Sequence, residues 1–391
     1  MSKWRKVKLG ESCTKIGSGA TPKGGSTVYT SNGTSFIRSQ NVYNLRFDYN
    51  GLTHINDEAA EKLKGVSVIE NDILLNITGD SVARTCIVPN TILPARVNQH
   101  VAIIRANNEL LNQRYLNYYL ASPAMQAYML SLAVGKGASR NAITKLMIEN
   151  FEVPCPSLEV QCRIAKILSR YDSLIENYQK QIKLLEESAQ RLYKEWFVDL
   201  RFPGHENTKI VDGMPEGWDN IKVGDLLCKI KKTKQVPTNS YQETGCIPII
   251  DQGKDYIAGF TDDNECLVKV EKDPYIVFGD HTRILKYINF SFAKGADGTQ
   301  LIMSNDKKRM PQSLLYCSLI NIDLSNYSYA RHFKYLKEEK ILLPLEDIAK
   351  KYNEIVNPVY INIKCYRKQI HILTEARDRL LPKLMSGEIE V

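Results

Sequence analysis

The chain contains the same sequence pattern twice, and this internal repeat limits the possible folds more than any other feature. The segment from Trp4 to Glu11, Trp-Arg-Lys-Val-Lys-Leu-Gly-Glu, is similar to the segment from Trp218 to Asp225. Further matches follow in the same order with steadily smaller offsets: Gly79-Asp80 with Gly279-Asp280, Leu146 and Pro154 with Leu336 and Pro344, and Tyr178–Leu185 with Tyr366–Leu373. A period of about half of the 391 residues indicates a duplicated domain and not a solenoid of short repeats.

Each copy begins with a globular part that we assign to the α+β class. Short apolar runs bounded by turn residues predict strands, for example at 66–69, 72–77, 100–104 and 273–278, and a helix is expected over Asn112–Leu132. The predicted boundaries are a first globular part at 1–155, a first long helix at 156–200, a linker at 201–217, a second globular part at 218–344, and a second helix with the C-terminal tail at 345–391.

Each copy ends in a long helix with a heptad pattern. Apolar residues recur at steps of four and three, which is the spacing of a coiled-coil seam. The predicted seam of the first helix consists of Tyr171, Ile175, Tyr178, Ile182, Leu185, Ala189, Leu192 and Trp196. The predicted seam of the second helix consists of Tyr352, Val356, Val359, Ile363, Tyr366, Ile370, Leu373 and Leu380.

Two residues disturb the second helix. Arg377 occupies a seam position, and Pro358 is expected to kink the helix or to end its first segment. Start signals precede both helices, at Pro156-Ser157 and at Pro344, and the first helix is expected to reach as far as Phe197.

Chain continuity predicts that the two helices pair in antiparallel orientation. A compact second globular part returns its chain close to the point of entry, so the second helix runs back along the first. The expected fold therefore has two similar globular parts separated by an antiparallel coiled coil, with an approximate two-fold axis across it. The alternative is two separate domain-helix units whose apolar stripes bind other proteins.

Composition permits several functions and excludes few. The 52 Lys and Arg against 44 Asp and Glu give a formal net charge of +8, which is compatible with a nucleic-acid partner but does not require one. The sequence has no apolar run long enough for a signal peptide or a membrane span. The nine scattered cysteines include no CxxC pair, so we expect reduced thiols, no metal site and a cytoplasmic protein.

Two segments superficially resemble catalytic motifs. Asn357-Pro-Val-Tyr360 is similar to the Asn-Pro-Pro-Tyr loop of amino-methyltransferases, but it lacks the second proline and lies inside the heptad pattern. The segment Gly17–Gly25 is rich in glycine but lacks the Gly-Lys-Ser/Thr ending of a phosphate-binding loop. No nuclease constellation is evident either, so no catalytic residue is assigned.

The remaining candidates are basic and amide side chains in glycine-rich loops. Arg and Lys can bind phosphates, and Arg, Asn and Gln can form paired hydrogen bonds with base edges in the major groove. The candidates in the first copy are Lys23, Arg38, Gln40, Asn41, Arg84, Arg96, Asn98, Gln99, Lys136, Ser139, Arg140 and Asn141. Those in the second copy are Lys231, Lys232, Lys234, Gln252, Lys254, His281, Arg283, Lys294, Arg331 and His332.

Several short motifs are distributed over nearly the whole chain: Trp4…Val7-Lys-Leu-Gly-Glu11, Gly19-Ala-Thr-Pro22, Gly79-Asp80, Pro154-Cys-Pro-Ser-Leu-Glu159, Phe278-Gly-Asp-His-Thr-Arg283, Gly295-Ala-Asp-Gly298, Arg331-His-Phe-Lys-Tyr-Leu336, Leu342-Leu-Pro-Leu-Glu346 and Leu381-Pro-Lys-Leu-Met-Ser-Gly-Glu-Ile389. With these motifs the chain resembles the specificity subunits of type I restriction-modification enzymes. The sequence departs from the family pattern at two places. Cys155 stands where many members have Leu, and Glu159-Val160-Gln161 stands where a doubled Glu-Gln is common.

The resemblance implies a non-catalytic DNA-recognition subunit with two target-recognition domains. Each domain would read one half of a split site in double-stranded DNA. The helices would set the gap and dock two modification (methyltransferase) subunits, and two restriction (endonuclease and translocase) subunits would join outside them. S-adenosylmethionine, ATP and Mg would then be cofactors of the partner subunits only. The alternatives from the residues alone are a coiled-coil scaffold with two protein-binding heads and a divergent nuclease or methyltransferase.

Overall fold

The computed structural model describes residues 4–134, 141–327 and 331–391. Two compact units divide the chain: the first comprises Met1–Asn177 and Ile370–Val391, and the second comprises Tyr178–Gln369. Each unit therefore contains one globular part and a stretch of each long helix. The long helices are α6 (Leu158–Tyr193) and α9 (Glu346–Ser386), and both continue from one unit into the other.

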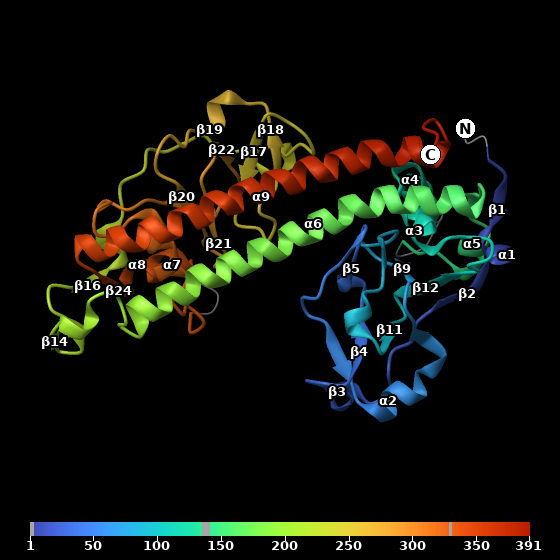
Figure 1. The fold of residues 1–391 in the computed structure, drawn as a ribbon, viewed down its shortest axis with the longest axis horizontal. Coiled ribbons are helices and arrows are strands. Elements are labelled where there is room, and N and C mark those ends of the chain that lie inside the picture. The colour runs from blue at the N-terminus through green and yellow to red at the C-terminus, as the bar shows by residue number, and fades with distance from the viewer. Residues whose placement is uncertain (1–3, 135–140, 328–330) are drawn as a thin grey trace. The chain divides into compact units, whose positions relative to one another are not determined.

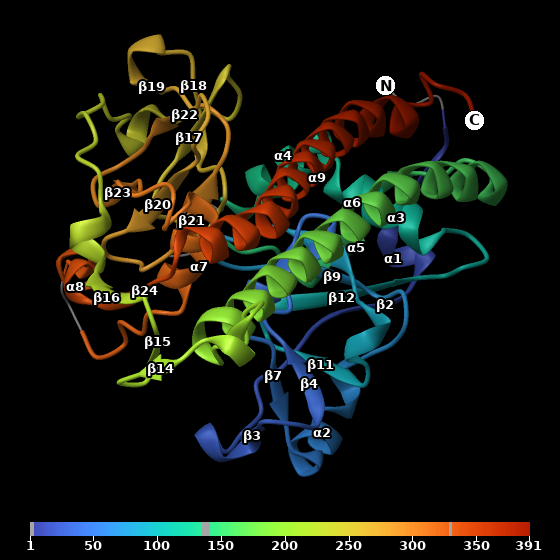
Figure 2. The same cartoon turned by 60° about the vertical axis from the view of Figure 1, so that its left-hand side comes forward.

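The first globular part is built on two sheets. One sheet has the strand order β10 (Thr85–Ile87), β9 (Ile73–Asn76), β12 (Val101–Ala106) and β2 (Cys13–Ser18). The other, which lies with α2 in Figure 2, has the order β3 (Tyr29–Thr30), β7 (Thr53–Ile55), β4 (Thr34–Ile37), β11 (Ala95–Val97) and β8 (Ser67–Val68). Two strand pairs, β1 (Lys6–Lys8) with β13 (Glu152–Pro154) and β5 (Val42–Tyr43) with β6 (Arg46–Phe47), complete it. Its helices are α1 (Leu9–Ser12), α2 (Asp57–Lys62), α3 (Gln113–Ala121), α4 (Pro123–Ala133) and α5 (Lys145–Glu149).

The second globular part repeats much of this arrangement. One sheet has the order β18 (Gly259–Thr261), β17 (Ile247–Ile250), β22 (Phe292–Lys294) and β19 (Leu267–Val268). The other has the order β21 (Leu285–Ile288), β20 (Tyr275–Gly279) and β23 (Thr299–Ile302). The strand pairs are β14 (Ile210–Val211) with β15 (Met214–Pro215) and β16 (Asp219–Lys222) with β24 (Lys340–Leu343), and the helices are α7 (Gln312–Ile320) and α8 (His332–Glu338).

The sequence repeat corresponds to a structural repeat. The Trp4 segment forms β1, which pairs with β13, and the Trp218 segment leads into β16, which pairs with β24. In both copies one parallel strand pair lies within an otherwise antiparallel sheet, β4 with β11 and β17 with β22. Two buried glutamines also correspond: Gln113 accepts from the Ala106 amide at 2.7 Å, and Gln312 accepts from the Ser304 amide at 2.7 Å. The prediction of two similar α+β parts is therefore confirmed.

The predicted helix over Asn112–Leu132 is wrong in one respect, because it is two helices. Pro123 lies in the first turn of α4, and Ser122 before it has an extended backbone, φ −65° and ψ 146°. A proline disfavours the helical conformation of the preceding residue, so α3 ends at Ala121.

Both long helices form much as the heptad pattern predicts. The Ser157 hydroxyl accepts from the Val160 amide at the start of α6, and a π-helical turn at Lys194–Val198 extends this helix past Phe197. The expectation that Pro358 would end a helical segment is wrong, because α9 is continuous over 41 residues. Pro358 lies at an exposed position of this helix, and its missing N–H removes one hydrogen bond of the helix.

Within each unit the helices run antiparallel, as expected (Figure 1). In the second unit Glu186 of α6 pairs with Arg367 at 2.9 Å, and Tyr352, earlier in α9, donates to the carbonyl of Ala189, later in α6. In the first unit Asp172 pairs with Arg377 at 2.7 Å. Each predicted seam residue is buried or half-buried.

The helices share the cores of the globular parts. In the first unit Leu168 of α6 and Leu381 of α9 belong to one buried cluster with Tyr115 of α3. In the second unit Tyr352 and Val356 of α9 belong to a buried cluster that contains Trp218. Each globular part is therefore packed directly onto the stretch of coiled coil in its own unit.

Candidate nucleic-acid interface

In the first unit several predicted DNA-contacting residues gather where the parallel strands β4 and β11 end. Parallel neighbours end at the same edge of a sheet, so the segments that follow them lie close together. Arg38 and Gln40 follow β4, and Gln99 follows β11. Arg38 and Gln40 both donate to the carbonyl of Gly51, at 2.9 and 3.1 Å, and Gln99 accepts from the Thr21 hydroxyl.

Asn41 cannot serve as a DNA contact, and this prediction is wrong. Its side chain is fully buried. The side-chain oxygen accepts from the Arg38 amide at 3.0 Å, and its nitrogen donates to the Asp48 carbonyl at 2.9 Å. These bonds fold the β5–β6 segment back onto the end of β4, so Asn41 shapes the loop.

The other candidates of the first unit differ in accessibility. Arg96 is half-buried and donates to the carbonyls of Ala60 and Ala95, both at 3.0 Å, and burial lowers the pKa of its guanidinium. Asn98 is also buried, and its side chain accepts from the His100 amide at 3.1 Å. Lys23, Gln40, Gln99 and Asn141 are exposed. The predicted contacts Lys136, Ser139 and Arg140 lie outside the described residues.

In the second unit the corresponding edge is organised by Gln252. This residue follows β17, the strand that runs parallel to β22. Its side chain accepts from the His281 amide at 3.1 Å and donates to the Asp297 carbonyl at 2.9 Å, while its own carbonyl accepts from the Thr282 hydroxyl at 2.6 Å. One glutamine thus joins the loop after β17, the β20–β21 turn and the β22–β23 loop.

His332 is the second candidate that the structure corrects. Only 3% of its surface is exposed, and its ring nitrogens lie 2.8 Å from the carbonyls of Asp280 and Tyr327. Arg283, which has a left-handed backbone at φ +62°, donates to the same ring at 3.1 Å. These contacts of His332 therefore hold the β20–β21 turn in place. His281, Thr282 and Arg283 of this turn are exposed.

Asp280 explains why the repeated Gly-Asp pair matters in the second copy. Its carboxylate is almost fully buried and accepts from the Phe333 amide at 2.8 Å at the start of α8. The start of the turn is therefore fixed to α8. In the first copy Asp80 is exposed, so the repeat conserves the position of the turn and not this contact.

The lysine candidates of the second unit differ in pairing and in exposure. Lys234 lies 2.7 Å from Glu265 and 2.9 Å from Asp263, and its hydrogen bonds to these carboxylates raise its pKa, so its charge is already balanced. Lys294 is half-buried, and burial lowers the pKa of its ammonium group. Lys231, Lys232 and Lys254 are exposed, as is Arg331.

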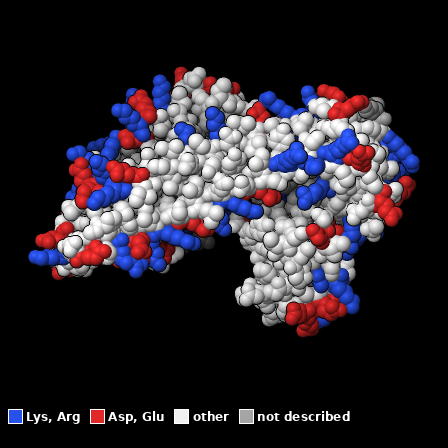
Figure 3. All heavy atoms as spheres, viewed as in Figure 1, with Lys and Arg blue, Asp and Glu red and all other residues white. Residues whose placement is uncertain are grey.

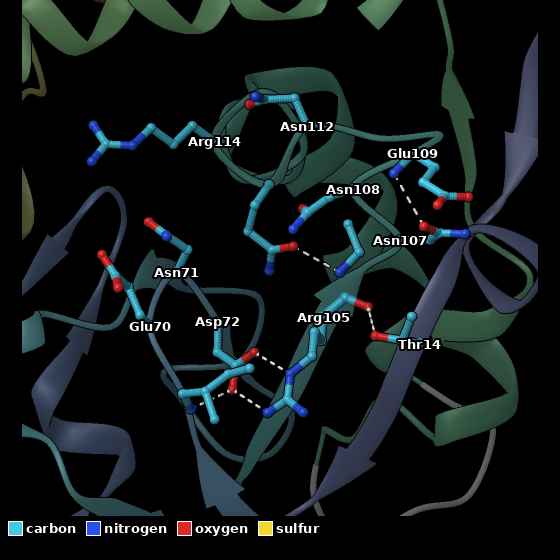
Figure 4. A pocket seen from close by; sticks show the side chains of 13 residues that line it. Thr14, Glu70, Asn71, Asp72, Arg105, Asn107, Asn108, Glu109, Asn112 and Arg114 are labelled. Carbon is cyan, nitrogen blue, oxygen red and sulfur yellow. Dashed lines mark hydrogen bonds and ion pairs between the residues drawn. The ribbon is translucent and has the colours of Figure 1, made fainter.

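A pocket of about 630 Å³ lies in the first unit, away from these loops (Figure 4). Its floor holds an ion pair of Arg105 with Asp72 at 2.7 Å, and Asp72 is 1% exposed as a side chain. The Asp72 carboxylate also accepts from the Ile69 amide at 2.8 Å, and its hydrogen bonds to Arg105 raise the pKa of the guanidinium. Both charges are thus committed to each other, which is the arrangement of a structural ion pair and not of an acid-base catalyst.

On the face drawn in Figure 3, acidic and basic side chains are interspersed, so the net positive charge is not gathered into one area there. The described residues include no group of three or more His, Cys, Asp or Glu side chains that could hold a metal ion. In the part of the chain that the structure describes, no helix is long and apolar enough to cross a membrane.

Comparisons with known proteins identify similar chains. Residues 1–187 match the family described as the type I restriction modification DNA specificity domain. The chain is 26% identical to the specificity subunit of the type I restriction enzyme MjaIX of Methanocaldococcus jannaschii, with 96% of this chain and 91% of that protein covered. It is 23% identical to the putative MjaX specificity subunit of the same organism, over 92% of this chain and 88% of that protein.

A solved structure supports the fold. The S subunit of a type I restriction-modification system from M. genitalium has a TM-score of 0.57 to this chain at 16% identity, and 98% of this chain and 96% of that chain are covered. At this identity the likeness concerns the fold alone. It agrees with two α+β parts and an antiparallel helix pair.

Proposed function

Because this chain belongs to the specificity subunits of type I restriction-modification systems, we propose that it reads a bipartite DNA site, one half with each globular part. The shared name of the relatives, specificity subunit, bears out the expectation that the chain recognises DNA and is not itself the enzyme. The observation that carries the bipartite reading is the structural repeat: both units present loops at the end of a parallel strand pair, β4 with β11 and β17 with β22.

The accessible members of each loop set, half-buried Arg38 and four exposed residues, would make the contacts. Arg38, Gln40 and Gln99 in the first unit, and His281 and Arg283 in the second, combine phosphate-binding and base-reading chemistry. Their backbones are held by buried residues such as Asn41 and His332, whose hydrogen bonds fix the loops before DNA arrives. Preorganised loops lose less conformational entropy on binding, which favours affinity and discrimination.

The helices would set the gap and dock two modification subunits. Several large apolar side chains face outward from α6 and α9: Leu174, Leu184, Ile355, Ile361 and Ile372. Leu184 alone is 64% exposed. Exposed apolar residues on a helix pair whose seam is already filled are typical of a surface for further subunits.

The chemistry would reside in the partners. No cofactor is assigned to this chain, and S-adenosylmethionine, ATP and Mg would bind to the modification and restriction subunits, two of each, in the cytoplasm. The buried pairing of Asp72 with Arg105 supports this division, because these two charges of the pocket in the first unit are committed to each other.

A domain exchange tests the proposal. Residues 1–155 are replaced by the corresponding part of a relative, and methylated adenines are mapped across the genome of a cell that carries the complete complex. We expect one half of the modified site to change and the other half and the gap to stay. A change in both halves, or a site without an unspecified middle, would contradict one reader per unit.

The gap is tested separately by lengthening the coiled coil. Four residues inserted in α6 add about 6 Å, nearly two base-pair steps of 3.4 Å, so the permitted gap should grow. An unchanged gap in an assembled and active complex would refute the role of the helices as a spacer.

A further inference from the structure

We propose that Arg46 and Arg84, gathered around the ring of Tyr43, form a phosphate-binding site in the first unit that holds the DNA backbone. We call these three residues the arginine pair and its ring. The inference rests on the proposed function, and it assigns a binding site to Arg46 and Tyr43, which no sequence motif marks.

The geometry places two guanidinium groups on one aromatic side chain. The guanidinium carbons of Arg46 and Arg84 each lie 4.7 Å from the centroid of the Tyr43 ring. They are therefore at most about twice that distance apart. A ring attracts cations through its quadrupole, so Tyr43 can hold both arginines in place although their charges repel each other.

Nothing among the described residues balances these two charges. Neither arginine has a carboxylate within ion-pair distance or a side-chain hydrogen bond to a described residue, whereas Arg105 in the same unit is paired with Asp72 at 2.7 Å. Each guanidinium presents five N–H donors in a fork that matches the oxygens of a phosphate. Two unpaired forks on one ring can therefore both bind phosphate oxygens.

The segment that carries the pair is fixed before any ligand binds. Tyr43 and Arg46 are directly opposite each other in the β5–β6 hairpin. The tip of this hairpin is bound to Thr85, the neighbour of Arg84: the Leu45 amide donates to the Thr85 carbonyl at 2.8 Å, and the Asn44 side chain accepts from the Thr85 amide at 3.1 Å. These bonds therefore fix the backbone of the hairpin that carries Tyr43 and Arg46 against the segment that carries Arg84.

The pair adjoins the loops that we propose to read bases. The buried residue Asn76 donates from its backbone to the Arg84 carbonyl at 2.8 Å and from its side chain to the Ser39 carbonyl at 2.9 Å. Ser39 lies between Arg38 and Gln40. Because the arginines occupy the ring, it is not free to stack on a base, so the site fits the sugar-phosphate backbone beside the bases that are read.

The experiment measures affinity against salt concentration. Complete complexes with Arg46→Ala, Arg84→Ala or both are titrated with DNA that contains the recognised site and with DNA that lacks it. Each lost phosphate contact should reduce the salt slope by about 0.9 and weaken binding about fivefold at physiological salt. Both DNAs should lose affinity by the same factor, because a backbone contact carries no sequence information.

Matched variants separate this role from damage to the fold. Lys62→Ala removes one positive charge from the same unit, but Lys62 is already paired with Glu58 at 2.5 Å, so its slope should equal that of the wild type. Tyr43→Leu should reproduce the loss by releasing both arginines, and Tyr43→Phe, which keeps the ring, should restore the wild-type slope.

Three results would overturn the inference. A wild-type slope in the double variant would exclude a phosphate contact. A loss confined to the recognised site would make the arginines base readers. Loss of a modification subunit from the complex would mean that they bind a protein carboxylate. If the wild-type complex itself failed to discriminate between the two DNAs, the proposed function would fail first, and that outcome is visible without any variant.

Discussion

The most informative stability experiment concerns Arg377, the charged residue in the apolar seam. In the first unit its guanidinium pairs with Asp172 of α6 at 2.7 Å, and the Tyr118 hydroxyl of α3 donates to the same carboxylate. The side chains of Arg377 and Asp172 are only 12% and 21% exposed. This network therefore connects both long helices with the first globular part at a place that is largely shielded from water.

The structure sets the size of the effect. Arg377→Ala leaves the Asp172 carboxylate in the seam without its cation, and breaking a buried pair in this way costs about 3–5 kcal/mol. Partial exposure and the remaining bond from Tyr118 reduce this, so we expect a loss of about 2–3 kcal/mol in the free energy of unfolding. The double variant Asp172→Asn with Arg377→Leu removes both charges, keeps an acceptor for Tyr118 and fills the seam, so it should recover most of the loss.

Urea unfolding of the full chain, followed by circular dichroism, measures these values. Arg379→Ala is the matched control, because Arg379 is 79% exposed and pairs with Glu375 on the surface, where a pair contributes about 0.5 kcal/mol or less. If Arg377→Ala were as stable as this control, or if the two substitutions at Asp172 and Arg377 were additive within about 0.5 kcal/mol, the assigned role of the pair would be wrong.

Three further predictions follow from single residues. Gln252→Ala should weaken binding of the second half-site about thirtyfold, because two hydrogen bonds of about 1 kcal/mol each no longer join the loops. Gln242→Ala, at an exposed side chain, should leave binding unchanged, and equal binding by both variants in a titration with cognate DNA would contradict this. Burial raises the pKa of the Cys86 thiol to about 12, so below that pH the thiol stays protonated. It should react with iodoacetamide on the order of a thousandfold more slowly than the exposed Cys162 thiol, and similar rates by peptide mapping would show that Cys86 is not buried. Pro358→Ala should raise the free energy of unfolding by about 1–3 kcal/mol, because Pro358 is exposed and interrupts the hydrogen bonds of α9; a lower midpoint in urea would show that the proline is needed.

The long helices could be predicted from the sequence because their signals are local. Heptad steps fix which side of a helix is apolar without any knowledge of the partner, and the predicted seam residues are accordingly buried or half-buried. The division at Ser122-Pro123 also had a local signal, since a proline restricts the residue before it. Pro358 shows the opposite case: packing of Val356, Tyr360 and Ile363 into the core of the second unit outweighs the local cost of a proline.

The loops could not be assigned residue by residue, because their hydrogen bonds join distant parts of the chain. Asn41 and Gln40 are adjacent amides of similar chemistry, yet one is buried and the other is exposed. His332 and His281 differ in the same way, and only the fold brings Asp280 and Tyr327 to the ring of His332. Arg46 could not be recognised from the sequence, because its proposed role depends on its position beside Tyr43 and beside Arg84, which is distant in sequence.

The charged contacts between the helices also specify which helices pair. In both units the acidic member belongs to α6 and the arginine to α9: Asp172 with Arg377 in the first unit, and Glu186 with Arg367 in the second. Two copies of α6 brought together along the same seam would place carboxylates in a shielded interface without these arginines, and two copies of α9 would gather guanidiniums there, which is costly for either sign. The apolar repeat alone would allow such pairings, because both seams follow the same heptad. The charged pairs therefore favour pairing of α6 with α9 over pairing between identical helices of two chains.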